Sequence, residues 1–401
     1  MTDGAKSAFP ENGRCGGTDP KTDTVIADYF LSRFIIGMEI TMEYTIGEIL
    51  RRFDLDFTSE PYGNGHINDT YIAGCDPKYI LQRINSNVFK NPPEVMENIA
   101  KVCDHLRRKI IAEGGNADRE TLTLVKTVDG QNYYKADDDN YFRVYRFIEN
   151  ARSVDIPESP EQYESAAKAF GKFQRLLSDF PANELHETIR DFHNTPKRFE
   201  ALEAAVREDK CGRAAEVSDE IEFAFKRKNI CPLIVDGLAD GSIPLRVTHN
   251  DTKLNNVMID NTTNRGLCVI DLDTVMPGSL LYDFGDALRG GAGTAAEDET
   301  DLSKVGIDMK LFEAFTRGFC SELADSFTER EIELLATSAI ILTYECGIRF
   351  LADYLMGDTY FKIHRPKHNL DRARSQFKMV ADMESKLDSM NRIVSDVLAG
   401  R

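Results

Sequence analysis

The stretch HNDTKLNNVMID, residues 249–260, groups a histidine, a carboxylate, a lysine and several amides directly before an apolar run. His249, Asp251 and Asn256 give it the spacing His-x-Asp-x-x-x-x-Asn, and Asp271 follows at the end of the apolar run LCVI. In phosphoryl transfer, one carboxylate orients the attacking hydroxyl and accepts its proton, while an amide oxygen and a second carboxylate hold Mg²⁺ against the phosphates. These residue types and their spacing therefore indicate phosphoryl transfer.

A lysine and a glycine turn add to this pattern. Lys253 can neutralise charge on the transferring phosphoryl group, and Gly63 and Gly65, far upstream, would let the backbone approach phosphates closely. The alternatives are a polar turn rich in Asx caps for the first motif and a plain hairpin turn for the glycines. Each alternative explains one feature alone, so the combination favours phosphoryl transfer.

The elements expected around these residues change character along the chain. Strands are indicated at 78–84, 122–128, 131–136 and 141–148, with helices at 44–53 and 92–111. Beyond residue 160 helical periodicity dominates, except around the 249–260 stretch. We therefore expect an α+β fold with a β-rich N-lobe at 41–149 and a larger, mostly helical C-lobe at 150–401. Residues 1–40, rich in Gly, Pro and polar residues, are expected to form an extension that is poorly ordered at its start.

Composition restricts the classes of partner. The formal net charge is −18, which should repel nucleic acids and anionic membranes because no strong Lys/Arg cluster offsets it. No apolar stretch free of polar groups is long enough to predict a transmembrane helix. The eight cysteines form no C-x-x-C pair, which indicates free thiols in a reducing cytosol and argues against zinc. We expect a cytoplasmic protein that acts on a small molecule.

Several motifs resemble one enzyme superfamily. HNDTKLNNVMID, VIDLDTVMPG and YDFGDALR are similar to the aminoglycoside phosphotransferase/choline kinase superfamily. GNGHINDTY, LQRINSNVF, MENI, ETIRDFHNT and ECGIRFLADYLMGDTYF resemble its N-acetylhexosamine 1-kinase members, over about residues 43–380. The resemblance implies a bilobal, protein-kinase-like fold, with ATP and Mg²⁺ as cofactors. It also implies transfer of the γ-phosphoryl group to the anomeric hydroxyl of an N-acetylhexosamine such as GlcNAc or GalNAc.

The resemblance assigns roles in the motif of the C-lobe. Asp251 would be the base that meets the substrate hydroxyl, and Asn256 and Asp271 would be the metal ligands. Asp273 would either support this site or bind a second metal ion. His249 would shape the loop and take no part in proton transfer.

A second aspartate would stabilise that loop. Asp283, in YDFGD, would accept hydrogen bonds from the loop backbone, a structural role.

For the nucleotide, the resemblance points to the N-lobe. Arg83 is the expected phosphate cation, although the neighbouring Gln82 lies on the opposite strand face and the sequence does not decide which of them faces the nucleotide. Glu97, on the following helix, is the expected ion-pair partner of Arg83. Phe147 and Glu149 lie in the hinge whose backbone would meet adenine.

For the sugar, the resemblance points to His66, Arg349 and Tyr360, beside Asp251. His66 directly follows the glycine turn. The alternative for Arg349 is an internal salt bridge with Glu345 or Asp353, which lie one turn away on the same helical face.

Other functions stay open. A kinase for choline, another amino alcohol or an aminoglycoside would share the fold, although the absence of tryptophan weakens a choline-type aromatic cage. A kinase-like binding module without activity would be expected to have lost an aspartate or a metal ligand, and all of them are present. Sugar preference, oligomeric state and the role of residues 1–40 are not readable from the sequence.

Overall fold

An antiparallel sheet forms the N-terminal part of the fold. The computed structural model describes residues 44–63, 67–323 and 326–400, so the predicted extension 1–40 lies outside the described residues. The sheet has the strand order β1-β2-β3-β6-β4, and β5 also pairs with β6. Its strands are β1 (Ser59–Pro61), β2 (Asp69–Ala73), β3 (Tyr79–Asn85), β4 (Leu124–Val125), β5 (Tyr134–Lys135) and β6 (Asn140–Arg146). β6 is buried along nearly its whole length, as expected for a strand covered on both faces.

One long helix follows the third strand and carries a regular apolar stripe. In α3 (Pro92–Ala112) the first turn contains two prolines, which helices accept there because those N–H groups lack intrahelical partners. The stripe consists of Val95, Ile99, Val102, Leu106 and Ile110, all buried. The Asn98 side chain, also buried, donates hydrogen bonds to the carbonyl oxygens of His186 (2.8 Å) and Val275 (3.0 Å). α3 is thereby connected to the segment that follows Asp271.

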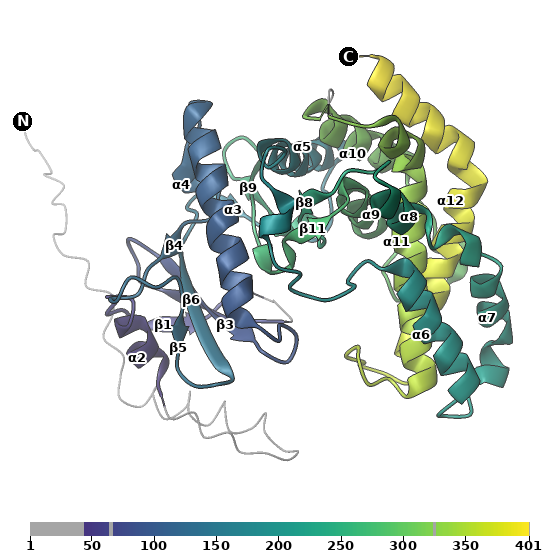
Figure 1. Ribbon diagram of the computed structural model, residues 1–401, viewed down its shortest axis with the longest axis horizontal. Coiled ribbons are helices and arrows are strands. Elements are labelled where there is room, and N and C mark those ends of the chain that lie inside the picture. Colours follow the sequence, from purple (N-terminus) through teal and green to yellow (C-terminus); the bar gives the residue numbers. More distant parts are fainter. Residues whose placement is uncertain (1–43, 64–66, 324–325, 401) are drawn as a thin grey trace, which may run out of the picture. The chain divides into compact units, whose positions relative to one another are not determined.

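Helices make up most of the remaining chain (Figure 1). They are α5 (Pro160–Leu176), α6 (Thr195–Glu208), α7 (Ser218–Phe225), α8 (Leu233–Asp240), α9 (Leu280–Gly291), α10 (Met309–Ser321), α11 (Glu329–Met356) and α12 (His368–Ala399), with the short α2 (Ile46–Arg51) and α4 (Ala117–Glu120) earlier in the chain. By length and apolar composition α11 alone among the described helices would be able to span a membrane, but 83% of its apolar window is buried inside the fold. α11 packs against α6, α9 and α12, which identifies it as a core helix.

Short strands frame the 249–256 loop. β8 (Arg246–Thr248) pairs with β11 (Met276–Gly278), and β9 (Val257–Asp260) pairs with both β10 (Gly266–Val269) and β7 (Ala151–Arg152). The loop thus leaves one strand pair and enters another. Because both its ends are held in antiparallel pairs, its backbone has little freedom.

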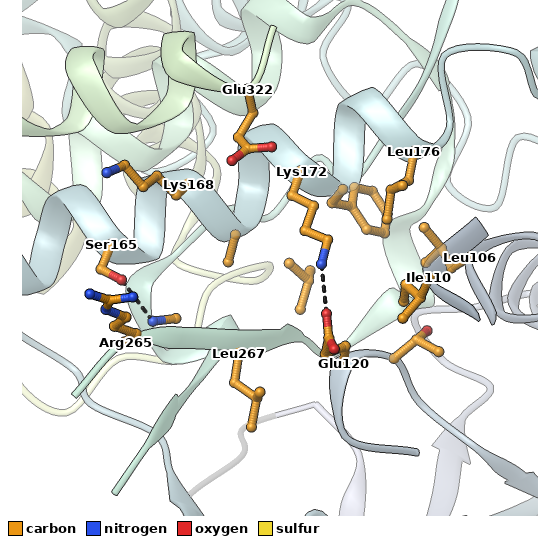
Figure 2. Close-up of a pocket in the computed structure, with 15 residues that line it drawn as sticks. Leu106, Ile110, Glu120, Ser165, Lys168, Lys172, Leu176, Arg265, Leu267 and Glu322 are labelled. Atoms are coloured by element: carbon orange, nitrogen blue, oxygen red, sulfur yellow. Dashed lines mark hydrogen bonds and ion pairs between the residues drawn. The ribbon is translucent and has the colours of Figure 1, made fainter. Parts of the chain in front are cut away.

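A cavity of about 230 Å³ lies between α5 and β10 (Figure 2). It is lined by residues of α3, α5 and β10, and Lys172 Nζ reaches Glu120 Oε2 at 2.6 Å across it. Ser165 Oγ accepts the Gly266 N–H at 3.0 Å, which connects α5 to the start of β10. The contact with α5 therefore fixes the position of β10, the strand that precedes Asp271.

The α+β prediction is confirmed by this arrangement of an N-terminal sheet and a mostly helical C-terminal part. The strands predicted at 122–128 and 131–136 are much shorter than expected, with only two residues paired in each of β4 and β5. Polar turn residues such as Asp129 and Gly130 end the ladder early there, since Thr127 caps its own turn through the Gln131 N–H.

Candidate active site

The 249–256 loop brings Asp251 and Asn256 into contact. Asn256 Nδ2 donates to the backbone carbonyl of Asp251 (2.8 Å) and to its carboxylate oxygen Oδ2 (3.1 Å). Asn250, just before, has a φ of 66°, a left-handed conformation that asparagine tolerates better than most residues. This turn directs Asp251 and Asn256 to the same side of the loop. Lys253 Nζ lies 3.1 Å from the same Asp251 oxygen.

Lys253 remains protonated in this position. Burial alone would lower its pKa, but the carboxylates of Asp251, Asp286 and Asp271 together raise it. Its side chain is nevertheless 44% exposed, so the ammonium group stays accessible from outside the protein. It can therefore meet a phosphoryl group beside Asp251.

Two carboxylates of α9 accept hydrogen bonds from the backbone of the loop. Asp283 accepts the N–H groups of His249 (3.0 Å) and Asn250 (2.7 Å), as expected for its structural role. Asp286 accepts the N–H of Thr252 at 3.0 Å. Burial raises the pKa of Asp283, although these backbone donors favour its charged form. Three backbone N–H groups of the loop thus have fixed carboxylate acceptors, which stabilise the shape of the loop.

Replacing Asp283 by Asn is expected to lower the free energy of unfolding by about 1.5–3 kcal/mol, because a charge-assisted hydrogen bond is lost inside the protein. Urea unfolding measures it, with Asp388→Asn on the exposed face of α12 as the control. A change within about 0.5 kcal/mol, typical of a surface substitution, would contradict this structural role.

His249 is fully buried and both its ring nitrogens are engaged. Nε2 lies 2.9 Å from the carbonyl oxygen of Ile270, and Nδ1 accepts the Asp251 N–H at 3.3 Å. The edges of the ring contact Phe170 and Phe173. With no nitrogen left for a substrate, His249 serves to shape the loop.

Asp271 lies beside Asn256 at the end of β10. The Ile270 N–H donates to the Asn256 carbonyl oxygen at 2.9 Å, and Asp271 follows with a φ of 59°. Within the described ranges no residue donates a hydrogen bond to the Asp271 carboxylate. Burial and the neighbouring charges of Asp273 and Asp251 raise its pKa to about 6. A carboxylate in this situation would be strongly stabilised by a cation.

These donors fit Mg²⁺. The Asn256 amide nitrogen is turned to Asp251, which leaves its amide oxygen available as a ligand. Among the described residues no group of three or more His, Cys, Asp or Glu side chains is arranged to hold a metal ion. Mg²⁺ held here would therefore complete its shell with phosphate oxygens and water, which is its usual mode in kinases.

Asp273 connects this site to the N-terminal sheet. It is 2% exposed, one carboxylate oxygen forms an ion pair with Arg143 of β6, and the other accepts Asn68 Nδ2 at 2.7 Å. Protein donors already reach both oxygens. Of the two roles expected for Asp273, the supporting one is therefore favoured.

Arg143 is the buried cation of the sheet, and the sequence analysis did not single it out. Its Nε and Nη2 donate to Gln82 Oε1 at 3.0 and 2.9 Å, so Gln82 lies on the face that carries Arg143 and Asp273. The available signal was a charged residue in the apolar strand YFRVYRFI, because an arginine there needs a buried acid.

Arg83 points to the opposite face, where it pairs with Asp69 and donates to Asn140. The expected Arg83–Glu97 ion pair is therefore wrong. Glu97 instead contacts Lys101 at 2.7 Å and His186 at 2.9 Å. The physical reason is the alternation of side chains along β3, which gives neighbouring residues opposite faces.

The described part of the nucleotide side includes one end of the glycine turn and the hinge. Gly63 has a φ of 75°, a conformation that glycine adopts without strain, while Gly65 and His66 lie outside the described residues. The Phe147 N–H donates to the Lys78 carbonyl at 3.1 Å, and Lys78 Nζ lies 5.2 Å from the centroid of the Phe147 ring.

Glu149 lies two residues further along the hinge. Its carbonyl oxygen accepts Arg119 Nη2 at 3.0 Å, and its carboxylate lies 3.5 Å from Lys78 Nζ. The segment between β6 and β7 is therefore anchored at both ends.

Arg349 of α11 is surrounded by aromatic rings. Its guanidinium carbon lies 5.7 Å from the ring centroid of Phe192, 5.9 Å from that of Tyr360 and 5.5 Å from that of Phe361. The side chain is half-buried, and no ion pair connects it to a carboxylate of the described residues. Burial and the nearby Arg349 charge lower the pKa of Arg198. Arg349 and Arg198 therefore lie close together without a direct ion pair from Arg349 to a described carboxylate, although the buried Glu345 interacts electrostatically with both.

The carboxylates expected as alternative partners of Arg349 are engaged elsewhere. Glu345 binds His193 (2.8 Å) and the Thr195 hydroxyl (2.6 Å). Asp353 accepts the backbone N–H of Tyr360 at 2.8 Å, along with those of its two neighbours, and so fixes the segment that carries Tyr360. The internal salt bridge considered for Arg349 is not formed.

His193 is a second residue that the sequence analysis left without a role. One ring nitrogen lies 2.8 Å from Glu345 Oε1 and the other lies 3.1 Å from the carbonyl oxygen of Asn250. Burial opposes its protonation, but Glu345 raises its pKa above the ordinary value. His193 thereby connects the helix of Arg349 to the loop of Asp251. Its motif, DFHNT, was noticed only as a resemblance.

Comparisons with known proteins agree with this geometry. The model of the phosphotransferase enzyme family, APH, matches residues 58–316. The chain is similar in structure to a microcompartment-associated aminopropanol kinase, at 15% identity and a TM-score of 0.56, with 92% of this chain and 99% of that chain covered. It is also similar to an aminoglycoside phosphotransferase from Alicyclobacillus acidocaldarius, at 13% identity and a TM-score of 0.58, with 90% of this chain and 99% of that chain covered.

A spectinomycin phosphotransferase, in complex with ADP and spectinomycin, is also similar, at 13% identity and a TM-score of 0.51, with 88% of this chain and 97% of that chain covered. At such identities the structural likeness shows the fold. The described sheet and helices therefore have the arrangement of these kinases.

Proposed function

The chain belongs to the phosphotransferase enzyme family, and on that premise we propose that it transfers the γ-phosphoryl group of ATP to the anomeric hydroxyl of an N-acetylhexosamine. The family supports a kinase that acts on a small molecule. A likeness to nucleotide-bound structures such as the ADP complex supports a nucleotide as donor. The choice of acceptor rests on the side chains of this protein.

The choice of acceptor rests on the Arg349 cluster, which consists of Arg349 and the rings of Phe192, Tyr360 and Phe361. No carboxylate of the described residues forms an ion pair with Arg349, and a second cation, Arg198, lies close by. Such a surface repels the ammonium groups of choline or an aminoglycoside, whereas sugar hydroxyl and carbonyl oxygens can accept its N–H donors. The exposed Tyr360 ring offers an apolar face beside it. An oxygen-rich, uncharged acceptor is therefore favoured over a cationic one.

Each residue of the loop would then have a separate role in the reaction. Asp251 accepts the proton of the anomeric hydroxyl, which is more acidic than an ordinary alcohol, so a carboxylate is an adequate base. Asn256 and Asp271 hold Mg²⁺, which when bound neutralises phosphate charge and orients the terminal phosphoryl group. Lys253 neutralises charge on the group in transfer. Catalysis is then mainly positioning and charge compensation.

An acceptor panel tests this proposal. The protein is incubated with ATP, Mg²⁺ and either GlcNAc, GalNAc, choline, kanamycin or an aminopropanol. We expect turnover with an N-acetylhexosamine, and a phosphorus NMR signal coupled to the anomeric proton of the product. Turnover confined to the amines would overturn the sugar assignment while leaving the kinase assignment intact.

Replacing Arg349 by Met keeps the side chain packed among the three rings but removes its charge. We expect the KM for the sugar to rise by about 10- to 100-fold, since a charge-assisted hydrogen bond contributes about 1.5–3 kcal/mol, while the KM for ATP stays unchanged. Steady-state kinetics at saturating ATP measures this. The control is Arg330→Met, at the exposed start of the same helix. Equal sugar KM values in the two variants would remove Arg349 from the acceptor site.

A further inference from the structure

A cavity of about 240 Å³ adjoins the 249–256 loop, on the side of Lys253. We call it the amide pocket and define it by Lys253, Asn255, Arg289, Gly290, Gly293 and Gln376, which are among the residues that line it. Lys253 contacts Asp251 at 3.1 Å, so the pocket wall touches the proposed base. A group bound here would lie next to the reacting atoms.

Two side-chain amides of the amide pocket have polar atoms without partners. Asn255 Nδ2 donates to Asp155 at 3.0 Å, which fixes the orientation of the amide and leaves Oδ1 buried without a hydrogen bond from any residue that the structure describes. Gln376 is 3% exposed, and its Oε1 also lacks a partner within the described chain. Each buried polar atom left in this state costs about 1–3 kcal/mol. Such atoms are rare in proteins and call for a donor that satisfies them.

Two glycines of the amide pocket have no packing reason to be glycine. A Cβ at Gly290 would meet only Lys253 Cγ at 3.9 Å, and one at Gly293 would meet nothing closer than 3.6 Å. Neither residue has a positive φ. By contrast, Gly291 is packed directly against Tyr163. Glycine within a helix weakens it relative to alanine, so the missing side chain of Gly290 in α9 is best explained by the space that it leaves. Gly293 lies beyond the helix, in a β-bridge with Ile307, and leaves space in the same pocket.

The charges on the wall of the amide pocket cancel. Arg289 is held by Asp286 and by Glu297, each at 3.0 Å, and Asp155 is engaged by Asn255. Lys253 pairs with Asp251. Asp155 forms no ion pair with a described residue, but the two cations and two carboxylates that line the pocket are equal in number, so the lining carries no formal net charge and suits an uncharged ligand.

We infer that the amide pocket binds an uncharged, hydrogen-bond-donating substituent of the acceptor, an amide N–H or a hydroxyl next to the reacting hydroxyl. The substituent donates to Asn255 Oδ1 and to Gln376, and Gly290 and Gly293 give it room. The amide pocket then selects among neutral acceptors. This inference rests on the proposed function for the identity of the acceptor.

Two variants test the amide pocket in different ways. Gln376→Leu keeps the side-chain volume and removes the hydrogen-bonding atoms. Gly290→Ala combined with Gly293→Ala fills the pocket and leaves Gln376 and Asn255 in place. Gln131→Leu, at an exposed turn, is the control. We expect both test variants to melt at or above the wild-type temperature, because they remove an unsatisfied buried polar atom or a helical glycine. We also expect them to keep the KM for ATP and to lower kcat/KM for the acceptor by about 3- to 10-fold, the size of one hydrogen bond.

The panel of GlcNAc and glucose identifies the substituent. A larger loss with GlcNAc identifies the acetamido group as the occupant, and equal losses identify a hydroxyl; both results support the inference. An unchanged kcat/KM for every acceptor in both variants means that the pocket holds only water, and this would overturn it. If the wild-type protein phosphorylates only amines, the proposed function fails separately. In that case the same variants are assayed with the amine as acceptor. A lower turnover of the amine in these variants would show that the pocket serves a cationic acceptor, and this would refute the inference of an uncharged ligand.

Discussion

Replacing Asp251 by Asn is expected to reduce kcat by about 10²- to 10⁴-fold, because a positioned general base contributes that much to a proton-transfer reaction. The fold should survive, since the asparagine can still accept the hydrogen bond that Asn256 Nδ2 gives to the Asp251 side chain. Nucleotide affinity should also persist, because the proposed metal ligands Asn256 and Asp271 are untouched. Turnover assays and thermal stabilisation by a non-hydrolysable ATP analogue measure the two effects separately.

The matched control for this experiment is Asp138→Asn, because the Asp138 side chain is 96% exposed in the turn between β5 and β6. It should leave kcat unchanged. Near-normal kcat in Asp251→Asn would contradict the assignment of the base. A simultaneous loss of activity and of stabilisation by the nucleotide analogue would instead indicate that Asp251 organises the phosphate site.

Replacing Arg143 by Met is expected to lower the free energy of unfolding by about 3–5 kcal/mol, because it leaves the Asp273 carboxylate buried without its cation. Both side chains are nearly inaccessible, at 1% and 3% exposure. Urea unfolding measures the change. Activity should fall as well, since Asp273 positions the segment that carries Asp271.

Arg83→Met provides the control within the same sheet. The Arg83–Asp69 pair is 38% and 50% exposed, and its loss should change stability by about 1 kcal/mol or less. The double variant Arg143→Met with Asp273→Asn should recover much of the stability, since no buried charge is left unpaired, but not the activity. If Arg143→Met and Arg83→Met prove equally mild, the ion pair with Asp273 does not link the sheet to the site.

The contrast between these two arginines explains why the sequence did not single out Arg143. Both lie in apolar strands of the same sheet, at places where a charged side chain is unusual. A shift of one residue moves a side chain to the other face of a strand, so only the register of β3 against β6 decides which arginine faces Asp273. The predicted Arg83–Glu97 pair failed for that reason.

The sequence by itself determined the features that are local. His249, Asp251, Asn256 and Asp271 lie within 23 consecutive residues, and their spacing places them on one loop and the hairpin that follows it. The bond from Asp283 to that loop was implied by the family resemblance of YDFGD, and the short strand β11 lies between Asp283 and Asp271. The α+β division also followed from periodicity along the chain, which needs no knowledge of long-range contacts.

Only the tertiary structure decided which distant groups meet. The pairing of Arg143 with Asp273 spans 130 positions and that of His193 with Glu345 spans 152. Helical spacing could not show that Arg349 forms no ion pair with Glu345 or Asp353. Spacing indicates which side chains are neighbours on a helix, but not which groups elsewhere in the chain form hydrogen bonds with them. The role proposed for Asn255 also depends on the tertiary structure. Its buried amide oxygen lines the same pocket as Gln376, a residue of the last helix whose oxygen likewise has no partner in the described chain. Charge compensation and hydrogen-bond satisfaction depend on all neighbours at once, and a sequence lists only those along the chain.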